Sequence, residues 1–220
     1  MKYQELEKYL FRNKDEKYAF FSKSLSNSDY LCIGIKIPLL QKIVKDHKDD
    51  KELKTKDFIL GKYLEIDLIY FWLSLVQFDS IDKKLSFLER NIGKAKSWVI
   101  TDSMACFLKK FDFDTYISFF KKCYDSPEVY KRRLAYVLGL KHYKNKDILE
   151  ILKYIRKDED YMVMMASAWL LATIAINYPT DVFLYLENLD DIRLKRKTIS
   201  KICDSRRITS DWKEKFKKLR

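Results

Sequence analysis

Pairs of amphipathic helical segments recur along this chain every 31 to 34 residues, with pairs beginning near residues 63, 95, 127 and 160. Joining stretches are short, which makes neighbouring helices antiparallel. The 220 residues include only 4 glycines and 3 prolines, too few for the many turns of a sheet protein. Helix pairs at this period bury their apolar faces on one another and stack into an α-solenoid with a concave surface. We therefore predict an all-α fold that forms a single domain over residues 1–220.

The boundaries of the helices follow from the same periodicity. Residues 3–24 have a helical pattern that breaks near Asn13 and Lys14, and Pro38 suits the first turn of a helix that ends near His47. The remaining helices are predicted at 63–77, 80–91, 95–109, 113–123, 127–143, 145–156, 160–176, 180–188, 192–204 and 210–219.

Positive charge is concentrated at the C-terminal end. The chain has 44 Lys and Arg against 32 Asp and Glu, a net charge of +12, and residues 192–220 contribute +9 of it. A surface that only keeps a protein in solution intersperses both signs, so this concentration favours a polyanion as partner. Salt-sensitive, sequence-independent contacts to phosphate groups are predicted for five residues of this stretch. They are Lys195, Lys197, Lys201, Arg206 and Arg207.

Several other classes of protein lack support in the sequence. No apolar run approaches the ~18 residues of a membrane span, and the charged N-terminal stretch lacks the apolar region of a signal peptide, so we expect a cytoplasmic protein. The two histidines, His47 and His142, are too few and too far apart for a His-rich metal site or a Ser/His/Asp triad. We expect no cofactor, no metal and a monomer. Reduced and mostly buried thiols are predicted for Cys32, Cys106, Cys123 and Cys203.

A tryptophan and an aspartate occupy an unusual position in the predicted helix 95–109. At about 100° per residue, one side of this helix carries a normal apolar stripe. That stripe consists of Ile100, Met104, Phe107 and Leu108. Trp98 and Asp102 fall together on the opposite side, one turn apart. Two interpretations of this helix stay open: Trp98 packs on a second layer while Asp102 caps or pairs, or the two residues belong to a site.

An arginine lies on the apolar stripe of the predicted helix 127–143. Arg133 is flanked there by apolar residues one turn away on each side, and such a position is costly unless the guanidinium finds an anion. The anion could be a phosphate; alternatively, Arg133 snorkels or pairs inside the solenoid with a carboxylate such as Asp102. Its neighbour Arg132 falls on a different side of the helix and is predicted to be an ordinary surface charge.

The predicted helix 160–176 is apolar nearly all round, which indicates a central, deeply packed helix. Trp169 therefore has two interpretations, as a core residue or as an indole whose edge is open to a groove beside small neighbours. Those small neighbours are Ala166, Ser167 and Ala168. The methionines of this helix are predicted to fill the core rather than to bind a ligand. They are Met162, Met164 and Met165.

Five segments in order resemble the HEAT-like repeat family of DNA alkylation repair proteins, the alkylpurine DNA glycosylases, over nearly the whole chain. The segments are YLCIGIKIP (30–38), SWVITDS (97–103), YKRRLAYV (130–137), ASAWLLA (166–172) and KTISKICDSRRI (197–208). The resemblance implies one curved stack of HEAT-like repeats that holds double-stranded DNA in a concave basic groove. It also implies that Asp102 is the catalytic aspartate, that Trp98 and Trp169 are site tryptophans, and that Arg133 contacts the DNA backbone beside the lesion. No metal or organic cofactor is implied.

The implied activity is hydrolysis of the N-glycosidic bond of cationic N3- or N7-alkylated purines. Such a base leaves readily because it is already positively charged, so one carboxylate that stabilises the oxocarbenium-like sugar and orients a water suffices. Aromatic faces favour the cation. The chain departs from active relatives at positions that are often polar, where it has Met164, Met165 and Ala172.

The N-terminal part also departs from the family pattern. The interval between Tyr18 and the GIKIP segment leaves little room for the helix that holds the lesion-bearing strand, as in a subgroup with a shortened N-terminal region. A second hypothesis is therefore a non-catalytic HEAT-repeat protein that recognises damaged, bent or branched DNA. A third, a scaffold that binds acidic protein, depends on charge alone.

Overall fold

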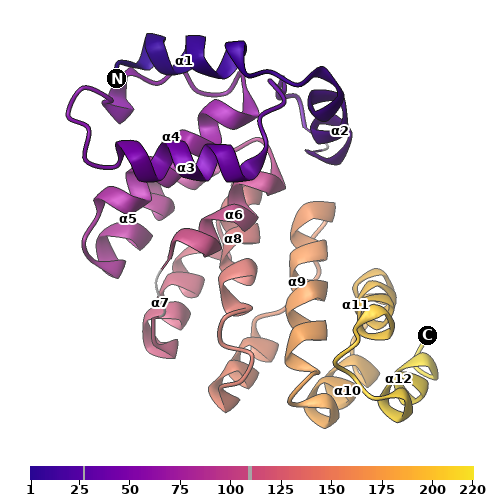
Figure 1. Ribbon diagram of the computed structural model, residues 1–220. Helices are drawn as coiled ribbons and strands as arrows, with labels where there is room; N and C mark the ends of the chain where they lie inside the picture. The colour runs from indigo at the N-terminus through magenta and orange to yellow at the C-terminus, as the bar shows by residue number, and fades with distance from the viewer. Residues whose placement is uncertain (27, 109–110) are drawn as a thin grey trace. The chain divides into compact units, whose positions relative to one another are not determined.

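The computed structural model describes residues 1–26, 28–108 and 111–220 (Figure 1). Its α-helices are α1 Tyr3–Arg12, α2 Glu16–Ser26, α3 Ile37–His47, α4 Leu64–Gln77, α5 Ile81–Asn91, α6 Trp98–Phe107, α7 Phe113–Cys123, α8 Val129–Gly139, α9 Tyr161–Ile174, α10 Pro179–Glu187, α11 Ile192–Asp204 and α12 Ser210–Lys217. Short 3₁₀ helices are η1 Thr55–Asp57, η2 Ile92–Lys94 and η3 Lys146–Lys153. In the described ranges, pairing of extended backbone is confined to one isolated bridge between Leu31 and Tyr63.

The helical-repeat prediction is confirmed. The first helices of successive pairs begin at Leu64, Trp98, Val129, Tyr161 and Ile192, which are 31 to 34 residues apart. The predicted break near Asn13 and the predicted helix through Pro38 are also present, as the end of α1 and the start of α3. None of the described helices combines the length and the apolar character needed to cross a membrane.

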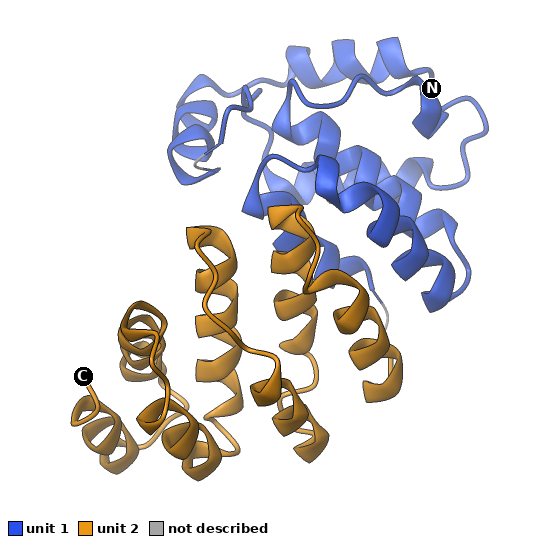
Figure 2. Cartoon of the chain, turned by 180° about the vertical axis from the view of Figure 1, so that it is seen from behind, with its two compact units in different colours: residues 1–109 blue, residues 110–220 orange. Residues whose placement is uncertain are grey.

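The chain divides into two compact units, Met1–Lys109 and Lys110–Arg220, which we call unit 1 and unit 2 (Figure 2). In unit 1, α4 packs against α3 and α6. In unit 2, α8 and α11 both pack against α9, while α7 packs on α8, α10 on α9 and α12 on α11. Each unit is thus a stack of helix pairs with its own core. The single domain over 1–220 and the concave basic groove remain predictions, and the predicted last residue of helix 95–109, Lys109, lies outside the described residues.

Polar side chains cap the beginnings of several helices. The side chains of Ser97, Asp112 and Asp160 accept backbone N–H groups in the first turns of α6, α7 and α9, respectively. Each cap satisfies a donor that has no partner within the helix and contributes about 1 kcal/mol to stability. The sequence therefore encodes these three helix starts locally, before any packing between helices.

One predicted helix takes a tighter form. The segment predicted as a helix over 145–156 is the 3₁₀ helix η3, Lys146–Lys153. Ile148 and Ile151 are fully buried, and residues three apart align on one side of a 3₁₀ helix. These two isoleucines pack this short segment against the core.

A buried carboxylate holds the backbone of residues 33–35 in unit 1. Glu65, in the first turn of α4, is 2% exposed. Its carboxylate accepts the backbone N–H groups of Ile33, Gly34 and Ile35 at 3.0, 2.8 and 3.3 Å. The next carboxylate of α4 is buried as well: Asp67 accepts the Tyr30 hydroxyl at 2.5 Å, and burial raises the pKa of Asp67. These two acids, rather than apolar packing alone, secure the 30–38 segment.

Two glycines have left-handed backbone, Gly34 with φ +93° and Gly61 with φ +86°. A Cβ at Gly34 would collide with the backbone of Asp15, whereas a Cβ at Gly61 would meet only the flexible end of Lys96. We expect Gly61→Ala to lower the free energy of unfolding by about 1–2 kcal/mol, the cost of the left-handed conformation. Gly34→Ala should cost more than ~2 kcal/mol because the steric collision adds to that cost. Urea denaturation of both variants measures the difference, and equal losses would contradict the role given to Asp15.

The N-terminal region forms two helices, as the broken helical pattern over residues 3–24 predicted. A connector of three residues separates α1 from α2, and α2 ends at Ser26, whereas the GIKIP segment begins at Gly34. The shortened N-terminal region, without the helix that holds the lesion-bearing strand, remains a prediction.

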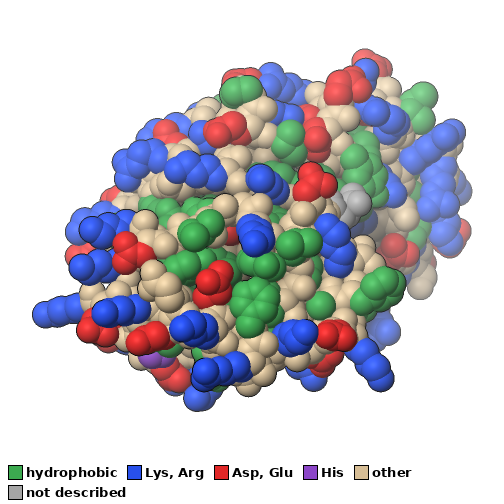
Figure 3. Space-filling view, turned by 90° about the horizontal axis from the view of Figure 1, so that it is seen from above, with side chains coloured by type: hydrophobic (Ala, Val, Ile, Leu, Met, Phe, Trp, Pro, Cys, Tyr) green, Lys and Arg blue, Asp and Glu red, His purple; other side chains and the backbone are tan. Residues whose placement is uncertain are grey.

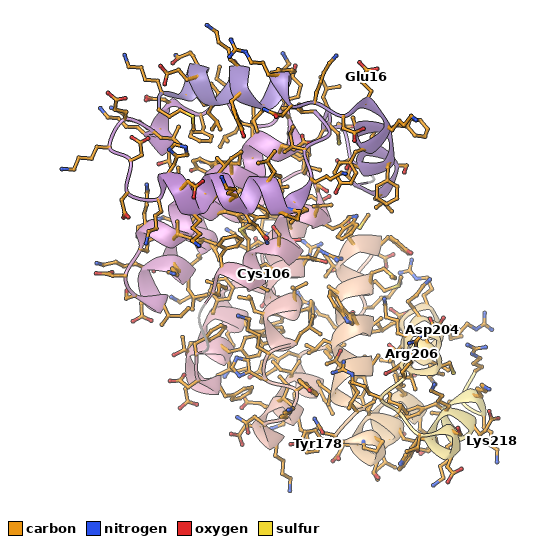
Figure 4. The ribbon with its side chains drawn as sticks, viewed as in Figure 1. Glu16, Cys106, Tyr178, Asp204, Arg206 and Lys218 are labelled. Carbon is orange, nitrogen blue, oxygen red and sulfur yellow. The ribbon has the colours of Figure 1, made fainter. Side chains whose placement is uncertain are left out.

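The four cysteines are free, but only Cys123 is buried. Cys106 is exposed on α6, where Figure 4 labels it. The prediction of mostly buried thiols is wrong here because Cys106 lies one turn beyond Asp102, on the side of the helix opposite the apolar stripe.

Candidate functional site

The predicted faces of α6 are present in unit 1. Ile100 and Met104 are completely buried, while Trp98 and Asp102 are partly exposed. The indole Nε1 of Trp98 donates to the carbonyl oxygen of Leu25 in α2 at 3.1 Å. The Oδ1 atom of Asp102 accepts the hydroxyl of Thr101 at 3.1 Å, and that hydroxyl also donates to the carbonyl oxygen of Trp98. Backbone and hydroxyl groups of one helical turn thus orient the carboxylate.

An apolar cavity of about 170 Å³ adjoins Trp98. Its walls come from α2, α3, α4 and α6, and they include Phe21, Leu25, Leu40 and Leu68. Trp98 therefore does pack on a second layer, as the first of the two interpretations predicted. The Asp102 carboxylate is not among the groups that line this cavity.

Arg133 is buried in unit 2, with 5% of its surface exposed. Its Nη1 donates to the carbonyl oxygen of Met162 in the first turn of α9 at 2.5 Å. This bond ties α8 to the beginning of α9 and supplies one polar partner for a guanidinium on an apolar stripe. The contact between Arg133 and a DNA phosphate remains a prediction.

Arg132 is a structural residue rather than an ordinary surface charge. Its Nε and Nη2 donate to the two carboxylate oxygens of Asp158 at 2.8 and 3.1 Å, and its Nη1 donates to the carbonyl oxygen of Ser126 at 2.8 Å. The surface-charge prediction is wrong because the loop before α9 brings Asp158 to this side of α8. A bidentate ion pair of this kind fixes the geometry of the loop and also neutralises the two charges.

Helix α9 is buried on nearly all sides, but its aromatic residues are not. Trp169 is 40% exposed although its small neighbours Ala166 to Ala168 are buried, so the indole is open to solvent. Tyr161 is 54% exposed, and Met165 lies between the two at intermediate exposure. Met164 fills the core as predicted, but Met162 and Met165 are partly exposed and do not. Sequence reasoning missed Tyr161, which the spacing of 161, 165 and 169 on one helix face would have indicated.

The predicted phosphate contacts of the C-terminal stretch point in different directions. The Nζ atom of Lys197 lies 5.8 Å from the ring centre of Tyr161, on the α9 side. Lys195 instead donates to the carbonyl oxygen of Glu187 at the end of α10. Arg207 lies over the ring of Tyr143 at 5.4 Å, and Arg206 is exposed just past the end of α11, where Figure 4 labels it near Asp204. Lys201 is partly exposed one turn after Lys197.

On the face shown in Figure 3, Lys and Arg side chains outnumber Asp and Glu, and hydrophobic side chains reach the surface between them. Within the described part of the chain, no group of three or more His, Cys, Asp or Glu side chains is arranged to hold a metal ion.

Comparison with known proteins identifies the family. The model of the family described as DNA alkylation repair enzyme matches residues 3–202. A search of curated proteins finds no match to the chain. The match covers both units and contains Trp98, Asp102, Arg133 and Trp169. Because it extends over most of the sequence, the chain belongs to the DNA alkylation repair enzyme family.

Proposed function

We propose that this protein binds double-stranded DNA as a monomer and hydrolyses the N-glycosidic bond of cationic N3- or N7-alkylated purines. The observation that carries the proposal is on α6, where the Asp102 carboxylate and the Trp98 indole are presented together, one turn apart and partly exposed. The membership of the chain in a DNA alkylation repair family supports the same substrate class.

The reaction needs little acid catalysis from the protein because the alkylated base is already a good leaving group. As the bond to the sugar breaks, positive charge develops on the deoxyribose, and the Asp102 carboxylate stabilises it and orients the attacking water. The aromatic face of Trp98 favours the same cation. Trp169 is proposed as a further site tryptophan. Arg133 contacts the backbone of the damaged strand, and the basic side chains of α11 and the loop after it contact phosphates.

Release of free base from duplex DNA that contains 7-methylguanine tests this proposal. With protein in excess over DNA, base release should exceed the spontaneous rate, and undamaged duplex should release none. The alternative, a non-catalytic protein that binds damaged or distorted DNA, is favoured by Met165, an apolar residue partly exposed where active relatives are often polar. Binding to the methylated duplex without release would support the alternative and refute the enzymatic proposal.

Charge reversal at Arg206 and Arg207 should weaken DNA binding and reduce its dependence on salt. Each lost phosphate contact lowers the magnitude of the slope of log affinity against log salt concentration by about 0.9. We therefore expect the double variant Arg206→Glu/Arg207→Glu to reduce the magnitude of the slope by about 2. Fluorescence anisotropy across a salt series gives the slope.

A matched control changes net charge by the same amount elsewhere. Lys54 and Lys56 flank the start of η1 in unit 1 and are exposed. If Lys54→Glu/Lys56→Glu reduces the slope as much as the double arginine variant, then net charge accounts for the effect and the two arginines are not DNA contacts.

A further inference from the structure

Helix α9 presents an apolar stripe to solvent, which is unusual for the exposed side of a helix. Its partly or fully exposed positions are Tyr161, Met162, Met165 and Trp169, and none of them carries a charge. At 100° per residue these four fall within an arc of about 100° and extend about 12 Å along the axis. Exposed helix faces are normally polar, and a contiguous apolar one indicates a binding surface.

Two lysines of α11 border this stripe. Helices α9 and α11 are packed neighbours (Figure 1), and two contacts fix how they meet. Arg193 pairs with Glu159 just before α9 at 3.2 Å, and Lys197 reaches the ring of Tyr161 one turn later. Lys201 lies a further turn along the same side of α11. The stripe therefore combines two aromatic rings and two methionines with cations along one edge.

This combination matches a nucleic-acid strand whose bases are not paired. In a paired duplex the base faces are hidden in the stack, so phosphates alone would meet the lysines and the aromatic rings would contribute nothing. In an unpaired stretch the base faces are available to stack on aromatic side chains, and the phosphates remain available to lysines. A hydrophobic protein partner would use the stripe but would gain nothing from the lysines along its edge.

We infer that the α9 stripe, with Lys197 and Lys201, binds unpaired nucleotides, so that the protein prefers DNA that contains a bulge or loop over the same DNA fully paired. The inference rests on the DNA binding proposed above and adds to it the structural class of DNA that is preferred. Tyr161 and Met165 supply this preference together with Trp169. Tyr161 and Met165 themselves take no part in the bond-breaking step.

Fluorescence anisotropy with three DNAs tests the inference: a paired duplex, the same duplex with a bulge of unpaired thymidines, and one single strand. Wild-type protein should bind the bulged duplex roughly tenfold more tightly per stacked base than the paired duplex, within the range that base–aromatic stacking supplies. Tyr161→Ala/Met165→Ser should remove most of this preference and leave the affinity for paired duplex unchanged. Tyr161→Phe, which keeps the ring, should retain the preference.

Leu184→Ala on α10 is the matched control, since it removes another exposed apolar side chain of unit 2; it should change neither affinity. Circular dichroism of each variant verifies folding, and a second readout is quenching of Trp169 fluorescence by the bulged DNA, obtained by difference from Trp169→Phe.

Equal wild-type affinity for paired and bulged duplex overturns the inference and leaves DNA binding intact. Equal weakening of both by the double variant overturns it too, because the stripe then contacts paired DNA. Absence of binding to all three DNAs refutes the proposed function itself.

Sedimentation tests whether the α9 stripe is instead occupied by a second copy of the chain. Wild-type protein should sediment as a monomer at all concentrations used for binding. A dimer that is abolished by Tyr161→Ala/Met165→Ser would mean that the stripe is a self-association surface, and the inference would fall.

Discussion

Replacing Asp102 by asparagine should lower the rate of 7-methylguanine release by on the order of 10²–10⁴-fold, as expected for loss of a positioned carboxylate. Asparagine has nearly the same shape and can still accept the Thr101 hydroxyl, so α6 should remain intact. It lacks the negative charge that stabilises the cationic sugar. Single-turnover release of free base is the measurement, and affinity for the methylated duplex should be unchanged.

The same change at an unrelated position provides the control. Asp82 is exposed in the first turn of α5, in the same unit as Asp102. Asp82→Asn should leave base release at the wild-type rate. If Asp102→Asn retains that rate as well, the carboxylate takes no part in the chemistry and the catalytic role proposed for it is refuted.

The largest effect on stability is expected for Glu65→Ala. This substitution leaves the buried N–H groups of Ile33, Gly34 and Ile35 without their acceptor. Each unsatisfied buried donor costs about 1–3 kcal/mol, and water that enters the space left by the side chain offsets part of the sum. We expect a loss of roughly 3–5 kcal/mol in the free energy of unfolding, measured by urea denaturation.

Two further variants separate the hydrogen bonds from the charge. Glu65→Gln keeps one acceptor oxygen and should lose less stability than Glu65→Ala. Glu16→Ala removes an exposed glutamate at the start of α2, labelled in Figure 4, and should change stability by no more than ~0.5 kcal/mol. A loss below 1 kcal/mol for Glu65→Ala would show that the 33–35 backbone finds other acceptors and does not depend on this carboxylate.

The repeat architecture was accessible from the sequence because its signals are local. Amphipathic periodicity sets the buried face of each helix, and caps such as Ser97 and Asp160 mark where helices begin. The roles of Glu65 and Asp67 were not accessible. Two acids in the first turn of a helix suit the helix dipole and predict a solvated surface, and only the tertiary structure brings the 30–38 backbone over them.

The candidate site could be predicted only in part, because helix geometry is a local signal whereas contacts between distant segments are not. The side of α6 on which Trp98 and Asp102 lie follows from helix geometry alone. The exposure of Trp169 does not, because the sequence allows both a core position and an indole open to a groove. The partners of charged residues do not follow. Arg132 pairs with Asp158, whose loop has a path that the sequence does not predict. Lys195 donates to the last residue of α10, whereas Lys197 lies over the Tyr161 ring of α9. A count of basic residues cannot distinguish these directions.

The attachment of α2 to the rest of unit 1 has a consequence for motion. Ser26 is its only fully buried residue, and Phe20 is 79% exposed. Two bonds join the end of α2 to α6, from Trp98 to the carbonyl of Leu25 and from the Ser97 hydroxyl to the carbonyl of Ser26. A helix with so little buried surface opens locally at a small fraction of the global unfolding free energy, so its amide hydrogens exchange long before those of α4. Local opening of α2 breaks the hydrogen bond from the Trp98 indole to Leu25 while the core around Trp72 stays closed.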